Sequence, residues 1–228
     1  MKPGLAAYFL AVAGIILQGL FIKIEHDEKY TLADIMKGSA SLMFVIIGLL
    51  ALKNPDCSPA FLRLIVIGLV CGMIGDILLN LRFVFAEQGQ KIFLAGIAVF
   101  LAGHILYLVA LIPYASHLAV AVIIGAALAA GLLYYIFKTM EVKKAFKIFG
   151  VVYLGAVIIM TCLAIDGAIM GGTSAWIFAV GAVLFTLSDI VLIFNTFSGV
   201  TKFSLRITNL SLYYLGQLLI ALSLYYPR

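Results

Sequence analysis

Long apolar stretches alternate along this chain with short breaks that carry charged residues, proline or glycine. Each stretch has about 20 mostly apolar residues, the length that an α-helix needs to cross the hydrocarbon core of a bilayer. The breaks include residues 25–29, 53–56, 82–91 and 138–147. The pattern predicts about eight transmembrane helices, at residues 4–22, 33–52, 61–80, 92–113, 118–137, 147–166, 175–195 and 205–225.

Composition supports the same fold class. Of the 228 residues, 65% are hydrophobic and 11% are charged, whereas a soluble domain carries roughly 25% charged residues. Backbone amides cannot stay unpaired in hydrocarbon, and the alternating pattern of a membrane barrel is absent, so the spans must be helices. We therefore predict an all-α integral membrane protein, with residues 1–228 forming one transmembrane domain and no separate soluble domain.

The net charge of +5 indicates how the protein is oriented in the membrane rather than binding to nucleic acid. No basic segment interleaved with aromatic residues is present, so nucleic-acid binding is not expected. Lysine and arginine gather in cytoplasmic loops, and one set of alternate loops holds ten of them against four in the other set, counted with the termini. This asymmetry predicts that both termini lie outside the cytoplasm, in a multi-pass protein of a membrane such as the bacterial inner membrane.

A weak internal repeat appears when the chain is shifted by 113 residues. Asp76 then falls on Asp189, Gly103 on Gly216, and His104 on Gln217. Two four-helix halves, residues 1–115 and 116–228, related by an axis along the membrane normal would give this pattern. Equivalent helices would then carry one aspartate each.

Asp76 and Asp189 are the carboxyl groups that most need an explanation. A carboxylate inside a span costs about 2.5–3.5 kcal/mol even on the lenient insertion scale. A functional pair facing the bundle interior would explain the cost, and so would helix-packing hydrogen bonds to neighbouring Ser or Asn side chains. The third and seventh spans run in the same direction, so both groups are expected on the same side of the membrane.

Other polar side chains complete a candidate site around the two aspartates. Lys37 is expected either to extend to the cytoplasmic surface or to neutralise an anion of the site. Arg82, Lys91, Lys202 and Arg206 lie toward the same membrane face and are candidates to meet a phosphate. The further candidate substrate contacts are Asn80, His104, Tyr107, Ser188, Tyr213, Tyr214 and Gln217.

The sequence lacks the residues that several kinds of catalytic site require. The chain has three histidines, and one of them, His104, is in the middle of a span, so an intramembrane zinc site of three histidines is not expected. The sequence contains no Gly-x-Ser-x-Gly elbow, phosphate-binding loop or Gly-x-Gly-x-x-Gly motif. Acid–base chemistry or ion transport by carboxyl groups remains, without a metal or organic cofactor.

Four short motifs resemble those of the YhhN family of membrane proteins. The shared residues are Gly75, Asp76, Leu78 and Leu79; Gly96, Phe100, His104 and Tyr107; Gly181, Ala182, Leu184, Phe185, Ser188 and Asp189; and Tyr213, Tyr214, Gln217, Ile220 and Ala221. Lys37 is only a half match, because Gly38 follows it where the family often has proline. The resemblance covers the third, fourth, seventh and eighth spans, in the family's order.

The resemblance implies a hydrolase of lysoplasmalogens, which are lysophospholipids with a vinyl-ether chain. The products would be a fatty aldehyde and a glycerophospho-alcohol. Cleavage needs a protonated acid and a carboxylate, the division of labour that glycosidases make around an oxocarbenium-like transition state. Asp76 and Asp189 would be this acid–base pair, with His104, Tyr107, Tyr213 and Gln217 orienting water or glycerol oxygens.

Two other functions remain compatible with the sequence. Paired intramembrane carboxyl groups and a tandem repeat also suit a proton-coupled transporter or a lipid flippase. A non-catalytic lipid-binding or scaffold protein would use the glycines only for helix packing. A carrier usually has discontinuous helices, and no proline lies inside the third, fourth, seventh or eighth span before Pro113, which favours the enzyme.

Overall fold

The computed structural model describes residues 3–142, 144–199 and 201–226. These residues form eight α-helices, one for each predicted span, with short 3-10 turns beside α4 at Ala86–Gln88 and Ile112–Tyr114. The α-helices are α1 (Leu5–His26), α2 (Tyr30–Ala51), α3 (Pro59–Val84), α4 (Gly89–Leu111), α5 (Leu118–Thr139), α6 (Lys144–Ile169), α7 (Thr173–Phe197) and α8 (Phe203–Ser223). The all-α fold class is confirmed.

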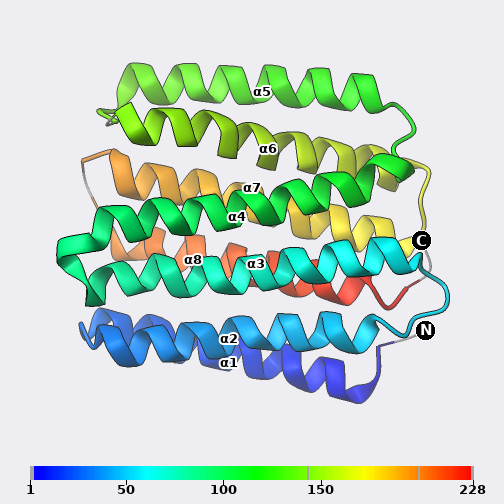
Figure 1. Cartoon of the computed structure of the whole chain (residues 1–228), viewed down its shortest axis with the longest axis horizontal. Helices are drawn as coiled ribbons and strands as arrows, with labels where there is room; N and C mark the ends of the chain where they lie inside the picture. Colours follow the sequence, from blue (N-terminus) through cyan, green and yellow to red (C-terminus); the bar gives the residue numbers. More distant parts are fainter. Residues whose placement is uncertain (1–2, 143, 200, 227–228) are drawn as a thin grey trace.

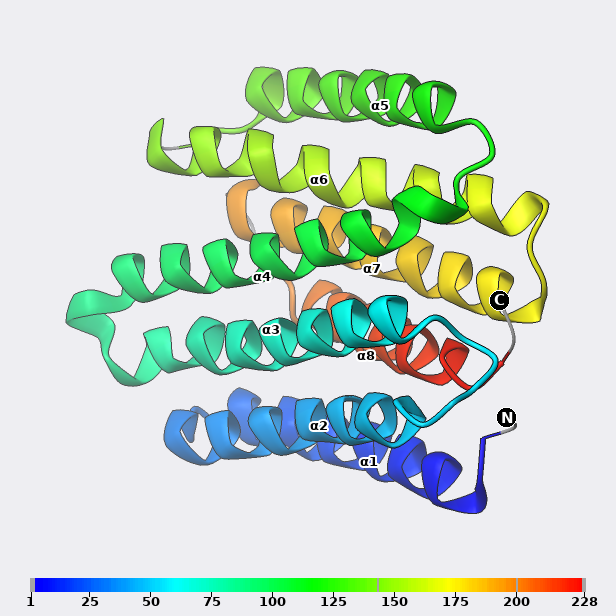
Figure 2. The same ribbon diagram turned by 45° about the vertical axis from the view of Figure 1, so that its right-hand side comes forward.

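The helices run alternately up and down in one bundle (Figures 1 and 2). Helices α1, α3, α5 and α7 finish at the end of the bundle where α2, α4, α6 and α8 begin. The closest packing joins α7 to α8 and α3 to α4, while α2 contacts both α3 and α8. Helix α5 lies at the edge and packs on α6. The loops predicted to be cytoplasmic therefore share one end, although the orientation itself stays a prediction.

The outer surface of the bundle is suited to lipid. Large apolar side chains such as Ile16, Ile123 and Trp176 are exposed around it. Among the described residues, seven helices are long and apolar enough to cross a membrane by length and composition. The protein is therefore a multi-pass membrane protein. Helix α8 is not among the seven, because it carries polar residues, including Asn209 and Gln217, that are buried inside the bundle.

Most helices extend beyond the predicted apolar spans. Helix α3 continues to Val84, so Arg82 is still helical, because helix geometry does not stop where the hydrocarbon layer ends. The predicted fourth span ends late, at Pro113. Helix α4 finishes at Leu111 and gives way to a 3-10 turn that contains this proline, since proline lacks the amide hydrogen that an α-helix interior requires.

Glycines allow the two tightest helix pairs to approach. A Cβ atom on Gly216 would lie 2.8 Å from the carbonyl oxygen of Gly181, and one on Gly103 would lie 3.1 Å from that of Gly68. These contacts join α7 to α8 and α3 to α4. The two glycine pairs are also separated by the 113 residues of the sequence repeat. The close packing fixes the helix faces that carry the polar side chains described next.

Candidate functional site

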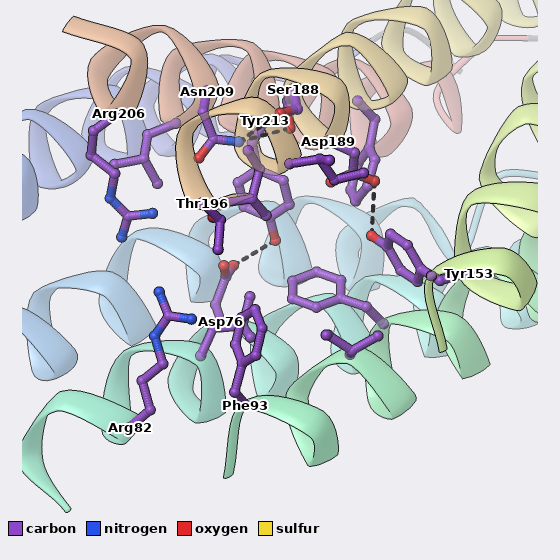
Figure 3. Close-up of a pocket in the computed structure, with 18 of the residues that line it drawn as sticks. Asp76, Arg82, Phe93, Tyr153, Ser188, Asp189, Thr196, Arg206, Asn209 and Tyr213 are labelled. Atoms are coloured by element: carbon purple, nitrogen blue, oxygen red, sulfur yellow. Dashed lines mark hydrogen bonds between the residues drawn. The ribbon is translucent and has the colours of Figure 1, made fainter. Parts of the chain in front are cut away.

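A cavity lies inside the bundle, toward the end at which α3 and α7 finish (Figure 3). Its water-accessible volume is about 110 Å³, within about 980 Å³ of empty space that includes its open side. Side chains from α2, α3, α4, α6, α7 and α8 line it. Both Asp76 and Asp189 reach this cavity from different walls. The structure thus brings together the two carboxyl groups that the sequence singled out.

Asp76 of α3 is surrounded by donors. Ser41 donates a hydrogen bond to its Oδ2 over 2.6 Å and Tyr213 donates to the same atom over 2.5 Å. Lys37 Nζ lies 3.3 Å from Oδ1, and both side chains are 3% exposed. An ammonium group and two hydroxyl groups all favour the ionised carboxylate. These contacts therefore offset part of the cost of burying a negative charge at Asp76.

Lys37 does not extend to the membrane surface. Of the two expectations for this residue, the geometry agrees with neutralising a site anion. Helix α2 presents Lys37 and Ser41 on one face because they are four residues apart. Tyr214 of α8 supports this face, since its hydroxyl donates to the Lys37 carbonyl over 3.2 Å and lies 3.1 Å from Ser41 Oγ.

Asp189 of α7 has a different environment. Tyr153 of α6 donates a hydrogen bond to its Oδ2 over 2.8 Å. In the described part of the chain no cation pairs with this carboxyl group, which is 5% exposed. The residue 113 positions after Lys37 is Gly150, which lines the cavity without a side chain. An apolar setting with a single neutral donor favours the protonated carboxylic acid over the carboxylate.

Both aspartates lie in the half of the bundle where α3 and α7 finish. Asp76 comes eight residues before the last residue of α3, and Asp189 comes eight residues before the last residue of α7. Eight residues correspond to roughly 12 Å of helix rise, and the two helices run in the same direction (Figure 1). The expectation that both groups lie on the same side is confirmed. The two carboxyl groups belong to different walls of one cavity, and Asp76 has more hydrogen-bond donors around it than Asp189 has.

The remaining candidates near the cavity form hydrogen bonds with other residues of the protein. Ser188 lines it and accepts from Asn209, whose amide donates to the Ser188 carbonyl over 2.9 Å. Arg206 also lines it, and its guanidinium donates to both carboxylate oxygens of Glu25, over 2.9 and 2.6 Å. Asn80 is fully buried with its amide between Glu25 and the backbone N–H of Asp34, so it does not line the cavity.

His104, Tyr107 and Gln217 lie outside the cavity lining, as does Tyr214. His104 Nδ1 is 2.8 Å from the Phe100 carbonyl oxygen, and Tyr107 donates to Gln217 over 3.3 Å. These groups form a buried polar layer between helices. Of the four side chains expected to orient water or glycerol, only Tyr213 reaches the cavity, and a role for the other three stays a prediction.

The structure adds residues that the sequence did not single out. Ser41 could have been found, because it shares a helix face with Lys37. Tyr153 and Asn209 gave no signal, since an isolated phenol or amide in an apolar helix is commonplace. Lys91 and Lys202 are exposed and do not line the cavity, whereas Arg82 does. Among the described residues no cluster of His, Cys, Asp or Glu side chains is arranged to hold a metal.

The chain is similar to known proteins over most of its length. Residues 32–224 match the model of the YhhN family. The mouse protein lysoplasmalogenase TMEM86B (Mus musculus) is 32% identical over 157 residues, which is 68% of this chain. The chain spans about 60% of the length of this curated relative. No solved structure matches. Because the family match covers α2 to α8, and hence every helix that lines the cavity, the chain belongs to the YhhN family.

Proposed function

We propose that this protein is a membrane hydrolase that cleaves the vinyl-ether bond of lysoplasmalogens. The observation that carries the proposal is the pair of buried aspartates, Asp76 and Asp189, which line one cavity in unequal environments. The name of the mouse relative supports the substrate class. The apolar lining from Phe93, Ile97 and Ile193 suits an aliphatic chain.

Asp189 is the general acid in this proposal and Asp76 is the carboxylate. The single phenol that contacts Asp189 leaves it neutral, whereas the ammonium of Lys37 and two hydroxyl groups keep Asp76 ionised. With Asp189 protonated and Asp76 paired to Lys37, these three side chains carry no net charge, which lowers the cost of holding them in the membrane.

The reaction balances with these two groups. Asp189 transfers its proton to the β-carbon of the vinyl ether, and an oxocarbenium ion forms whose charge the Asp76 carboxylate stabilises. Water adds to the cationic carbon and gives its proton to Asp76, which yields a hemiacetal. Asp76 then protonates the glycerol oxygen as the C–O bond breaks, and the hemiacetal hydroxyl proton returns to Asp189. One water is consumed, and an aldehyde and an alcohol leave.

Transport is the second candidate function. A proton-coupled carrier could use the same carboxyl groups, but carriers commonly have broken helices near the bilayer centre. Helices α3, α4, α7 and α8 are each continuous from end to end. This continuity favours an enzyme with a fixed site over a carrier or flippase.

Aldehyde release from the purified, detergent-solubilised protein tests the proposal. The substrates are a lysoplasmalogen and, as a control, an ester lysophospholipid of equal chain length. The variants are Asp76→Asn and Asp189→Asn, with Asp27→Asn as an exposed matched control. We expect aldehyde from the vinyl ether alone, a loss of about 10²- to 10⁴-fold in kcat for either site variant, and no loss for the control.

Two outcomes would reject the proposal. Substantial turnover in both site variants would remove the aspartates from the chemistry. Absence of aldehyde from well-folded wild-type protein would remove the reaction itself and favour the transport alternative. Proton-coupled lipid movement in vesicles, measured with the same variants, would then be the next experiment.

A further inference from the structure

Two arginines from distant parts of the chain meet at one end of the cavity. Arg82 comes from the last turn of α3 and Arg206 from the first turn of α8, and both extend toward the space beside Asp76 (Figure 3). Both line the cavity. Two guanidinium groups on one cavity end are costly unless anions neutralise them, because arginine stays charged in proteins.

In the part of the chain that the structure describes, only one of the two guanidinium groups is paired with a carboxylate. Arg206 makes a bidentate pair with Glu25, which uses both carboxylate oxygens. Arg206 and this same Glu25 are among the charged groups close to Arg82. Within the described residues no carboxylate pairs with Arg82, and its buried Nε donates no hydrogen bond. The three side chains together therefore leave one positive charge at the cavity end.

Aromatic rings hold Arg82 in place but accept none of the conventional hydrogen bonds that its guanidinium group can donate. Its guanidinium carbon lies 4.3 Å from the ring centroid of Phe93 and 4.6 Å from that of Phe83. Such stacking orients the planar group and leaves its edge free for hydrogen bonds. A fixed guanidinium edge that faces a cavity is suited to bidentate binding of a phosphate.

We propose that Arg82 binds the phosphate of the lysophospholipid substrate, with Arg206 as the second positive wall. The assignment rests on the proposed hydrolase function. It specifies that this end of the cavity recognises the phosphate of the substrate. It predicts that the protein distinguishes lipids with a phosphate from lipids without one. The amine of the head group lies beyond the phosphate, and Arg82 does not recognise it.

The spacing along α3 agrees with the length of the substrate. Arg82 follows Asp76 by six residues, which is roughly 9 Å of helix rise. A glycerol unit, with its phosphate ester at one end and its ether oxygen at the other, has a comparable extended length. Phosphate bound at Arg82 would therefore put the vinyl ether level with Asp76, in the cavity that Asp189 also lines.

A pair of substrates that differ only in the phosphate tests the proposal. One is the lysoplasmalogen, and the other is the 1-alkenylglycerol with the same chain. Arg82→Gln and Arg82→Lys are compared with Arg63→Gln, an exposed arginine nearer the opposite end of α3. For Arg82→Gln we expect about a 10- to 100-fold rise in KM for the lysoplasmalogen, the worth of a charge-assisted hydrogen bond. We expect little change for the alkenylglycerol, partial recovery in Arg82→Lys, and no effect of Arg63→Gln.

Equal losses on both substrates would overturn the proposal and assign Arg82 a structural role, and so would unchanged kinetics on both. Competition by inorganic phosphate, without any difference between the two lipids, would indicate a free-anion site and also overturn it.

Binding separates this proposal from the catalytic one. A saturated 1-alkyl lysophospholipid contains no vinyl ether and cannot be cleaved by this chemistry, so its Kd reports recognition alone. If wild-type protein cleaves neither alkenyl substrate, the hydrolase function fails. A Kd weakened about tenfold or more by Arg82→Gln would still support the phosphate site, whereas an unchanged Kd would reject it.

Discussion

Lys37 and Asp76 form an ion pair in the interior of the helical bundle, with Nζ 3.3 Å from Oδ1 and both side chains 3% exposed. The pair links α2 to α3, and Ser41 and Tyr213 complete the donors around the carboxylate. A buried pair costs desolvation of both charges, so it is weak evidence for stability alone. In the proposed mechanism, the pair favours the ionised form of Asp76, whereas Asp189 has no such cation among the described residues.

Replacing Lys37 by Met should disable the site and destabilise the fold. The substitution leaves the Asp76 carboxyl group buried without its cation, and breaking a buried pair costs about 3–5 kcal/mol. We expect a lower unfolding temperature in detergent and loss of aldehyde release. The double variant Lys37→Met with Asp76→Asn should regain stability but no activity. Lys91→Met, at an exposed lysine, should change neither property. A stable and active Lys37→Met protein would contradict the assigned role.

The helices were predictable because lipid imposes a simple rule on them. A span must be apolar over about 20 residues and must pair its own backbone groups, so all eight helices could be read from the sequence. The shared side of Asp76 and Asp189 followed from counting those spans. The loop glycines and charges marked where each helix had to stop, although not how far its last turn extended.

The contacts within the site depend on helix rotation and packing, which the sequence pattern does not fix. Tyr153 could not be assigned to Asp189, because α6 carries no motif that shows which face it turns toward α7. Asn80 was expected at the substrate from its position one turn after Asp76. It is instead buried, with its amide between Glu25 at the end of α1 and the backbone of Asp34 in α2. For Lys37, surface and site positions were both compatible with the spacing.

The sequence repeat gains support from the packing, and we propose that the two halves arose by duplication. The glycine contacts and the two aspartates all recur after 113 residues. The halves differ beside the aspartates, since Lys37 of α2 has Gly150 as its counterpart in α6. The presence of Lys37 gives Asp76 a cation, and Gly150 supplies none to Asp189.

Removing the phenol hydroxyl in Tyr153→Phe should lower kcat with little change in KM. Tyr153 donates to Asp189 Oδ2 over 2.8 Å, so in the proposed mechanism it orients the carboxyl group of the general acid. We expect roughly a tenfold loss, the size of one hydrogen bond to a charged or ionisable group. Steady-state aldehyde release gives both constants. Tyr134→Phe, at an exposed tyrosine of α5, is the control. A pure KM effect would indicate that Tyr153 contacts the substrate instead.

Gly216→Ala should separate α7 from α8. The added Cβ would lie 2.8 Å from the Gly181 carbonyl oxygen and 3.0 Å from the Phe185 amide nitrogen, and these backbone atoms cannot move without their helix. Overpacking of this kind costs about 1–3 kcal/mol. Gly131→Ala in α5, where a Cβ meets nothing within 4 Å, should be neutral or stabilise by about 0.5–1 kcal/mol through helix propensity. Thermal unfolding of both variants in one detergent compares them, and equal unfolding temperatures would contradict the packing argument.

The Glu25–Arg206 pair should stabilise the bundle, while Arg82 remains the group proposed to bind the phosphate. It joins the end of α1 to the start of α8 through two hydrogen bonds, and Asn80 also donates to Glu25. A double-mutant cycle with Glu25→Gln and Arg206→Gln should give a coupling free energy of about 0.5–3 kcal/mol in unfolding. Because Arg82 is proposed to carry the phosphate, Glu25→Gln should leave KM unchanged or lower it, since the cavity end becomes more positive. A raised KM in a stably folded Glu25→Gln protein would show that Glu25 itself contacts the head group, and the charge assignment at this end of the cavity would have to be reversed.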